Sequence, residues 1–183
     1  MIIIVIPAKG GSTRLPNKNM ALINGRPMLD YSIDAAKACK TTNSVYVSTD
    51  SETIASHARE LGVSVIMRPE SLGGDIPIIE VYRHAVENIP EGTETIETLI
   101  GLQPDHPDRT VSIDEAHKAF SDAEADFLYS TEADGTKNGS HYILSRYMLD
   151  SGEARKDVCV IDDCTNVHYQ EDLDQAATRL GET

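Results

Sequence analysis

The sequence is poor in cysteine, and its three cysteines are badly placed for cross-linking or metal binding. Cys39, Cys159 and Cys164 form no CxxC pair, and their number is odd. Such usage is typical of a reducing compartment and argues against a disulfide framework or a zinc site. We therefore expect a cytoplasmic protein.

Cations are also scarce. The 183 residues include 16 Lys and Arg against 30 Asp and Glu, a formal net charge of −14. A field of this sign repels nucleic acid and anionic lipid surfaces. The apolar stretch at residues 1–6 has no charged segment before it and is far too short to span a bilayer. We expect neither nucleic acid nor a membrane as a partner.

What remains is the composition of an ordinary globular domain, with 40% hydrophobic and 25% charged residues. A chain of this length has a core large enough to fold without disulfides or metal ions. Short apolar runs alternate with segments of helical periodicity, which favours a three-layer α/β fold around a mostly parallel sheet. We expect a single domain over residues 1–183.

The expected elements follow from this alternation. Residues 2–6 form an aliphatic run that is typical of a buried central strand. Further strands are predicted over residues 45–47, 63–67, 98–102, 126–130, 142–144 and 158–161. Helices are predicted over residues 27–39, 51–61, 78–89, 113–120 and 171–180, and a polar loop over residues 132–140.

Charge is distributed unevenly along the chain. Residues 1–29 hold four cations (Lys9, Arg14, Lys18 and Arg26) and no carboxylate. A solvated basic turn is one explanation. Because these cations are interleaved with glycine and proline, we prefer an anion-binding loop in which backbone N–H groups and cations converge.

Polar loops follow three of the predicted strands, at residues 7–19, 48–50 and 103–109. In open parallel sheets, ligands bind beyond the carboxyl ends of the strands. We therefore expect the three loops to meet at one edge of the sheet. Within the second loop we expect Asp50 to cap the following helix.

The first of these loops reads PAKGGSTRLPNKN over residues 7–19. It contains neither GxxxxGK[ST] nor GxGxxG, the common nucleotide fingerprints. It resembles the opening motif of the CMP-sialic acid (acylneuraminate) cytidylyltransferases. Its STRLP portion is closer to the cytidylyltransferases of 3-deoxy-manno-octulosonate (Kdo). The resemblance implies a Rossmann-like nucleotide-diphospho-sugar transferase fold.

The resemblance continues along most of the chain. Matching segments are VSTD (47–50), RPESL (68–72), LQPDHPDRT (102–110), NGSHYI (138–143) and NVHYQEDL (166–173). Two departures stand out. A short loop at 132–138 replaces the family's long dimerisation insertion, so we expect a monomer or a dimer of another kind. In addition, Asn166 and His168 stand where the family has paired aspartates.

The resemblance implies an activity and a set of site residues. The activity is transfer of CMP from CTP to an acidic sugar of the nonulosonic, sialic type, with release of pyrophosphate. The alternatives are a Kdo or other sugar nucleotidyltransferase, and a degenerate homologue that binds nucleotide without turnover. The implied catalytic residues are Lys9, Arg14, Lys18 and Asp105. The implied nucleotide-binding residues are Ala8, Gly10, Gly11, Ser12, Asn19, Arg68 and Asp75.

The sugar and a divalent cation complete the implied site. Gln103 and Arg109 would contact the sugar. Mg²⁺ or Mn²⁺ would be held by Asp105, Asn166 and His168. Three plainer roles stay open: Asn19 as a turn residue, Arg68 as a solvated cation, and Arg109 in a salt bridge to Asp108 or Asp105.

Overall fold

A seven-stranded sheet forms the centre of the molecule, whose computed structural model describes residues 1–42, 44–73, 76–90 and 96–181. The strands follow the order β5-β4-β1-β6-β8-β7-β9. Their bounds are β1 (Ile2–Pro7), β4 (Val45–Thr49), β5 (Ser64–Met67), β6 (Thr98–Gly101), β7 (Phe127–Thr131), β8 (Lys137–Ser145) and β9 (Asp157–Ile161). Of these strands, β8 alone runs antiparallel to its neighbours. The sheet is mostly parallel, as the sequence predicts.

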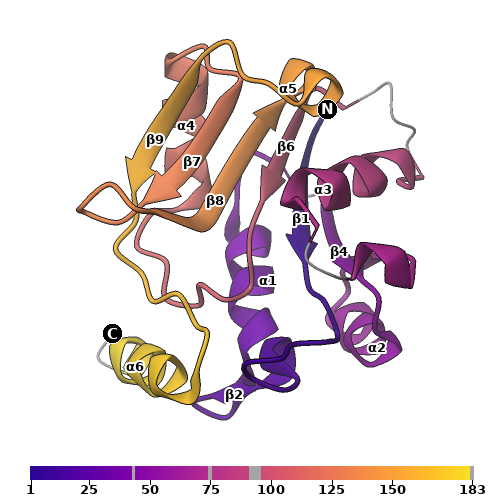
Figure 1. Ribbon diagram of the computed structural model, residues 1–183, viewed down its shortest axis with the longest axis vertical. Helices are drawn as coiled ribbons and strands as arrows, with labels where there is room; N and C mark the ends of the chain where they lie inside the picture. Colours follow the sequence, from indigo (N-terminus) through magenta and orange to yellow (C-terminus); the bar gives the residue numbers. More distant parts are fainter. Residues whose placement is uncertain (43, 74–75, 91–95, 182–183) are drawn as a thin grey trace.

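Helices cover both faces of this sheet and complete the three layers that Figure 1 shows. One face packs against α1 (Met28–Ala38), α2 (Glu52–Glu60) and α4 (Ile113–Asp122). The opposite face packs against α3 (Ile78–Glu87) and α5 (Arg146–Ser151). None of the helices in the described ranges combines the length and the apolar character needed to cross a bilayer.

Strand β1 is buried on both faces, as its unbroken aliphatic run predicts. Ile4 and Ile6 belong to the core under α1, whereas Ile3 and Val5 belong to the core under α3. All four side chains are completely buried. This alternation places β1 at the middle of the sheet, so the loop that follows it starts from a rigid support.

Local sequence sets the ends of the predicted helices. Pro27 occupies the N-cap of α1, where its fixed φ suits the entry into a helix. Ser51 is the N-cap of α2, and its side chain accepts a hydrogen bond from the Ile54 amide at 3.5 Å. The expectation that Asp50 caps this helix is therefore wrong. Gly62 follows α2 with φ +72, the left-handed conformation that commonly ends a helix.

The connection between β7 and β8 is a tight hairpin, which corrects the loop predicted over residues 132–140. Thr131 already pairs with Lys137, so the end of that range belongs to β8. The polar composition of the range suggests a loop, but Asn138 is buried and accepts a 2.6 Å hydrogen bond from Ser130. A buried, paired amide is as compatible with a strand as an apolar side chain.

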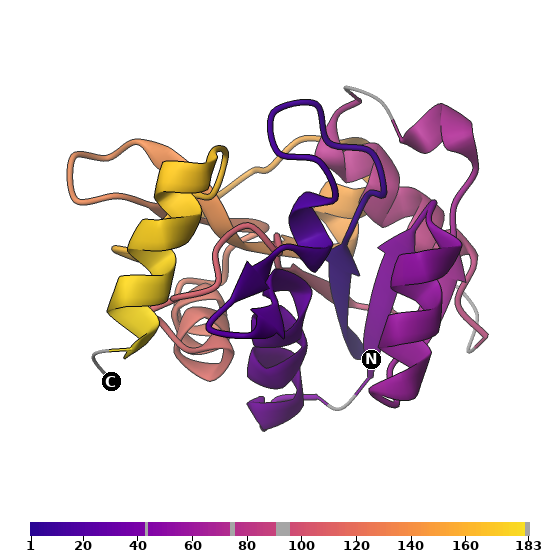
Figure 2. The same cartoon turned by 90° about the horizontal axis from the view of Figure 1, so that it is seen from below.

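Five short elements of the described residues are not predicted by the sequence, among them the 3-10 helices Lys18–Met20 and Glu70–Leu72. Strands β2 (Leu22–Ile23) and β3 (Arg26–Pro27) form a small hairpin, and α5 has six residues. Elements of this length are too short for periodicity to reveal them. Helix α6 (Gln170–Gly181), predicted over residues 171–180, packs against β2. Figure 2 shows α6 beside the N-terminal segment that contains this hairpin.

Candidate active site

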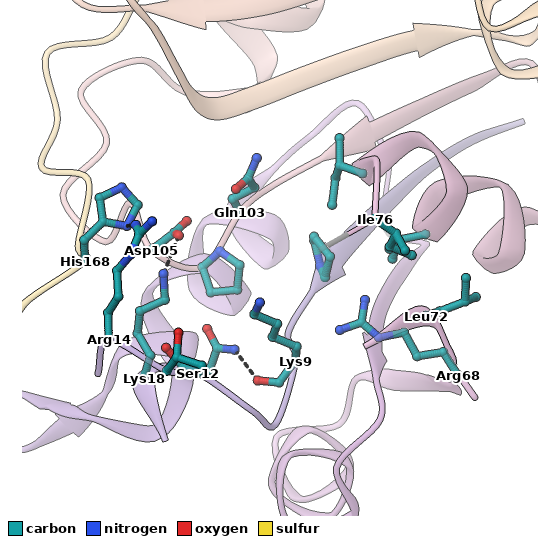
Figure 3. A pocket seen from close by; sticks show the side chains of 16 residues that line it. Lys9, Ser12, Arg14, Lys18, Arg68, Leu72, Ile76, Gln103, Asp105 and His168 are labelled. Atoms are coloured by element: carbon teal, nitrogen blue, oxygen red, sulfur yellow. Dashed lines mark hydrogen bonds and ion pairs between the residues drawn. The ribbon is translucent and has the colours of Figure 1, made fainter. Parts of the chain in front are cut away.

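The segments that follow β1, β5 and β6 open into one cavity of about 400 Å³. The predicted site residues that line it are Lys9, Ser12, Arg14, Lys18, Asn19, Arg68, Gln103, Asp105 and His168. Figure 3 shows Lys9 and Lys18 from the loop after β1 and Arg68 from the segment after β5 around the cavity. The expectation that strand-end loops converge at one edge of the sheet is confirmed for residues 7–19 and 103–109.

Charge in this cavity is opposite in sign to that of the whole protein. The described lining holds four cations (Lys9, Arg14, Lys18 and Arg68) and a single carboxylate, that of Asp105. The protein as a whole carries −14. Converging cations of this kind bind a ligand with several negative charges, such as a triphosphate, and steer it toward the cavity.

Arg68 is the most buried of the four cations, at 7% exposed. Burial lowers the pKa of its guanidinium, and the charge of Asp50 opposes that effect. Its Nε is buried and donates to no described acceptor. Since buried donors are nearly always paired in native proteins, this N–H favours an anionic ligand in the cavity over the role of a solvated cation.

Lys18 and Asp105 form the central ion pair of the cavity. The Lys18 ammonium donates to Asp105 Oδ2 at 2.7 Å and to the Val167 carbonyl at 3.1 Å. Burial by itself would raise the pKa of Asp105, but the neighbouring His106 and Lys18 lower it by more, so the net pKa lies well below its usual value. Asp105 is therefore ionised over the whole physiological pH range.

His168 lines the cavity as a neutral imidazole. Burial lowers its pKa, and the positive charges of Lys18 and Arg14 lower it too, more than Asp105 raises it. An Arg14 guanidinium N–H lies 3.4 Å from His168 Nδ1. The Arg14 donor fits an unprotonated Nδ1, so the second ring nitrogen carries the proton.

Asn166 lies in the segment beside Asp105, although it does not line the cavity. Val167 N donates to the carbonyl oxygen of Asp105 at 2.9 Å, which holds this segment against the loop after β6. The Asn166 side-chain oxygen is buried and accepts no hydrogen bond from the described residues. Among those residues, no three His, Cys, Asp or Glu side chains are grouped so as to hold a metal ion.

The loop after β1 is braced by two contacts that the sequence does not reveal. The Asn19 side-chain amide donates to the Lys9 carbonyl at 2.8 Å, and the Gly10 amide donates to Asp50 Oδ1 at 2.7 Å. A Cβ at Gly10 would lie 2.7 Å from that of Ser51, so only glycine fits there. Glycine at position 10 therefore allows the loop to pass close to α2, and the Asp50 carboxylate holds the loop there.

Of the remaining predicted residues, Ala8, Gly11 and Arg109 do not line the cavity. Ala8 is completely buried, Gly11 is exposed, and Asp75 lies outside the described residues. The Arg109 guanidinium donates to the Ser140 carbonyl at 3.1 Å, to Ser32 Oγ at 3.0 Å, and to the carbonyl oxygens of Gln103 and His106. The alternative of an Arg109 salt bridge to Asp108 is not what the structure has, since Asp108 pairs with Arg179 at 2.8 Å.

An apolar wall of the cavity is not predicted by the sequence. Leu72, Ile76, Ile78 and Val81 line it from the region before α3 and from the start of α3. Aliphatic residues at helix spacing indicate a core face equally well, so the pattern carries no functional signal. The wall gives the cavity one charged and one apolar side, which suits an anionic ligand with a flat, less polar part.

Comparison with known proteins adds a family to this geometry. Residues 3–140 match the family model described as Cytidylyltransferase. Over 125 residues, 67% of this chain, the sequence is 35% identical to N-acylneuraminate cytidylyltransferase of Escherichia coli O18:K1:H7 (strain RS218 / NMEC). Over 107 residues, 58% of this chain, it is 33% identical to 8-amino-3,8-dideoxy-manno-octulosonate cytidylyltransferase of Shewanella sp. (strain W3-18-1). The aligned segments span 29% and 41% of those two proteins.

A solved structure shares the fold along the whole chain. The CTP complex of CMP:2-keto-3-deoxy-manno-octonic acid synthetase superimposes with a TM-score of 0.79 and covers 99% of this chain and 98% of its own. Sequence identity is 15%, so the likeness bears on the fold alone. It confirms the predicted Rossmann-like nucleotide-diphospho-sugar transferase fold.

Proposed function

The chain belongs to the cytidylyltransferase family, as its motifs predict, and we propose that it transfers CMP from CTP to an acidic sugar of the nonulosonic, sialic type. Pyrophosphate is the second product. Both relatives named above act, by their names, on acidic sugars. The observation that carries the proposal is the cavity itself, in which four cations and one carboxylate face each other inside a strongly anionic protein.

The reaction is an in-line displacement at the α-phosphorus of CTP. A sugar hydroxyl oxygen forms the new bond to phosphorus, the bond to the bridging oxygen of the β-phosphate breaks, and the hydroxyl proton leaves to solvent. Such reactions depend on positioning and on neutralisation of the developing charge. Lys9, Arg14 and Lys18 supply positive charge for the triphosphate and for the departing pyrophosphate. The unpaired Nε of Arg68 adds a further donor.

A divalent cation, Mg²⁺ or Mn²⁺, is the proposed cofactor. The donor set fits a hard cation that is held by one carboxylate and by the phosphates of the nucleotide. Asp105 Oδ1 lies 3.1 Å from His106 Nδ1 and Oδ2 accepts from Lys18, so a metal ion would share this carboxylate with both side chains. Asn166 Oδ1, which accepts no hydrogen bond from the described residues, and His168 Nδ1, once released by Arg14, would add the remaining protein ligands. When bound, the ion would neutralise phosphate charge.

Gln103 is the residue that we assign to the sugar. It lines the same cavity as Asp105 and Lys9 and follows β6 at the carboxyl edge of the sheet. A neutral amide offers both a donor and an acceptor, which suits the hydroxyl groups of a sugar. Arg109 does not share this role, because its N–H groups already donate to Ser32 and to backbone carbonyls.

A nucleotide-binding homologue without turnover is the second candidate. Two observations favour it. Asn166 and His168 replace the family's paired aspartates, and Lys18 lies 2.7 Å from Asp105, where it competes with a metal ion for that carboxylate. Such a protein would bind CTP through the same cations and release no pyrophosphate.

Pyrophosphate release distinguishes the two candidates. CTP is incubated with N-acetylneuraminate or with Kdo, in the presence of Mg²⁺ or Mn²⁺, and the CMP-sugar is identified by mass spectrometry. We expect sugar-dependent release with CTP and much less with UTP, GTP or ATP. If CTP binds in calorimetry but neither sugar yields pyrophosphate, the transferase proposal fails and the binding protein is favoured.

The proposed protein works in the cytoplasm as a monomer, or as a dimer that differs from the family's. The turn between β7 and β8 supports the proposed oligomeric state: the Glu132 amide donates to the Thr136 carbonyl at 2.8 Å, so the connection is too short to reach around a second subunit. Light scattering at micromolar concentration tests it. A dimer whose crystal structure has residues 132–136 at the centre would contradict the proposal.

A further inference from the structure

A buried carboxylate behind the cavity ties together two segments that are far apart in the sequence. Asp162, directly after β9, is 0% exposed. Its Oδ1 accepts hydrogen bonds from Thr110 N at 2.7 Å, Thr110 Oγ1 at 2.8 Å and Val111 N at 3.2 Å. Its Oδ2 accepts one from Ser140 Oγ at 2.6 Å. One carboxylate thus joins the loop after β6 to strand β8.

These two segments also determine where Gln103 lies. The Gln103 carbonyl accepts a hydrogen bond from the Arg109 guanidinium. The Gln103 side-chain amide packs against Gly139, where an added Cβ would lie only 2.7 Å from Gln103 Nε2. Gly139 has φ +83, so its backbone also adopts a conformation that favours glycine. Gln103 is therefore held at its backbone by one segment and at its side chain by the other.

The two contacts of Gln103 lie directly beside the two anchors of Asp162. Arg109 precedes Thr110, and Gly139 precedes Ser140. Arg109 Nε also donates to the Ser140 carbonyl at 3.1 Å, which closes the connection between the segments. We propose that Asp162 is a positioning residue that fixes the Gln103 amide for the acceptor sugar. The inference rests on the proposed function, in which Gln103 contacts the acceptor.

Asp162 acts through its neighbours, because nothing in solution can reach it. Ser140, His141 and Asp162 lie together but not as in a hydrolase triad, because Ser140 Oγ at 2.9 Å and Asp162 Oδ2 at 3.3 Å both lie at His141 Nδ1. All three are 0% exposed, and Ser140 Oγ donates directly to the carboxylate. A buried serine whose hydroxyl is already bound to a carboxylate is no nucleophile. The arrangement serves to hold backbone.

Asp162 can link residues 110–111 to Ser140 by itself because its side chain is charged. A carboxylate only accepts hydrogen bonds, so it satisfies donors on both of its oxygens. An amide in the same place would keep an acceptor for Thr110 but turn a donor toward Ser140 and His141. We therefore expect Asp162→Asn to weaken the link between residues 110–111 and Ser140, and Asp162→Ala to abolish it.

The test compares acceptor kinetics with nucleotide affinity in both variants, using CTP with N-acetylneuraminate and with Kdo. We expect kcat/KM for the acceptor to fall about tenfold in Asp162→Asn and about a hundredfold in Asp162→Ala, because small displacements of a positioning group have effects of this size. CTP affinity should stay within about twofold, since Lys9 and Lys18 belong to another loop.

The matched control is Asp126→Asn. Asp126 is also buried, at 6% exposed, and accepts hydrogen bonds from Arg155 at 2.8 and 2.7 Å and from Ser145 at 3.1 Å. It holds no segment of the cavity. A general loss of stability would affect this control as much as the Asp162 variants, whereas a positioning role leaves its acceptor kinetics unchanged.

The outcomes separate the inference from the proposed function. Unchanged acceptor kinetics in both Asp162 variants, or an equal loss of CTP affinity, would overturn the inference while the transferase stands. If the wild type transfers CMP to neither sugar, the proposed function fails, and crystal structures of the variants decide the positioning role. A displaced Gln103 with residues 8–19 in place supports it, and an unmoved Gln103 overturns it.

Discussion

The cavity and the region around β7, β8 and β9 use buried charge in opposite ways. Around those strands, carboxylates are saturated: Asp108, for example, accepts hydrogen bonds from Thr165 N and Oγ1 at 2.8 Å and pairs with Arg179 at 2.8 Å. In the cavity, the Lys9 ammonium forms no ion pair with any described residue, and Arg68 Nε is buried without an acceptor. One region is complete in itself, and the other is incomplete without a ligand.

This difference separates stability from function. Saturated carboxylates repay their desolvation with several hydrogen bonds and so fix the relative positions of segments. Unpaired cations in one cavity repel each other and gain their partners only when an anion arrives. Substitutions in the saturated region should therefore act on the free energy of unfolding, and substitutions in the cavity should act on binding and turnover.

Asp105 offers the strongest test, because it is the only carboxylate in the described lining of the cavity. Asp105→Asn keeps the size of the side chain and removes its charge. We expect turnover to fall about 100- to 1,000-fold, the effect of removing a group that acts on developing charge. CTP affinity should hold or rise, because Lys18 loses its anionic partner. Steady-state kinetics and calorimetry measure the two quantities.

Asp34→Asn is the control for that substitution, since Asp34 is 59% exposed and pairs with Arg26 on the surface. A loss of CTP affinity in Asp105→Asn that matches its loss of turnover would show that the carboxylate supports binding in general. Asp105 would then not fit the distinction between cavity groups that gain partners from a ligand and carboxylates that are already fully paired.

Lys9→Ala directly tests a cavity cation that forms no ion pair with the described residues. Loss of a charge-assisted hydrogen bond costs about 1.5 to 3 kcal/mol, so CTP affinity should fall roughly 10- to 150-fold. The midpoint of thermal unfolding without ligand should not fall, because the Lys9 ammonium forms no ion pair with the described residues. Lys118→Ala is the control, since Lys118 is 74% exposed in a surface pair with Asp122. Equal CTP affinity in wild type and Lys9→Ala would remove Lys9 from the site.

Most of the fold and half of the chemistry could be predicted from the sequence, because both depend on local patterns. The aliphatic run at residues 2–6 predicts strand β1, and Pro27 predicts the start of α1. The cations of residues 7–19 are close together in sequence, so a shared site needs no knowledge of the fold. Parallel topology then brings Gln103 and Asp105 to the same edge.

Contacts between distant segments could not be predicted in this way. Asp162 contacts Thr110 and Ser140, and no spacing rule links these positions. Arg109 resembles a carboxylate-binding residue by type, yet the fold surrounds it with backbone carbonyls. Asp50 resembles a helix cap, yet it holds the amide of Gly10. For Arg109 and Asp50 the partners include backbone groups, which carry no signature in the sequence, and the hydroxyl partners of Asp162 lie 52 and 22 positions away along the chain.

Arg179→Ala tests the saturated region. It leaves the carboxylate of Asp108, which is 4% exposed, without its cation. Arg179 is 31% exposed, so the cost should lie between that of a surface pair and that of a buried one, at about 1.5 kcal/mol of unfolding free energy. CTP affinity should be unchanged. Urea denaturation measures the free energy of unfolding, and calorimetry measures CTP affinity. Weaker CTP binding at wild-type stability would mean that Arg179 acts on the ligand site and not on the stability of the fold.

The smallest expected effect concerns Asp114, another carboxylate with several donors, which joins the start of α4 to the segment after α1. In the first turn of α4, its carboxylate accepts hydrogen bonds from Thr41 Oγ1 at 2.7 Å, Thr41 N at 2.9 Å and Lys40 N at 3.1 Å. These bonds, led by the Thr41 hydroxyl, lower the pKa of Asp114 to about 2. A carboxyl with a lowered pKa stabilises the fold above its unfolded value near 4, and this contribution is lost as pH falls toward 2.

Asp114→Asn should therefore unfold more easily at pH 7, by about 1 kcal/mol after allowance for solvent screening. The gap between wild type and variant should narrow as pH drops from about 4 to 2, because the wild type then loses the charge that the variant never had. Urea denaturation at a series of pH values measures the gap. Asp122→Asn is the control, since Asp122 is 65% exposed and should change stability by less than about 0.5 kcal/mol at any pH. A gap that stays constant with pH would mean that the Asp114 charge contributes nothing to the stability of the fold.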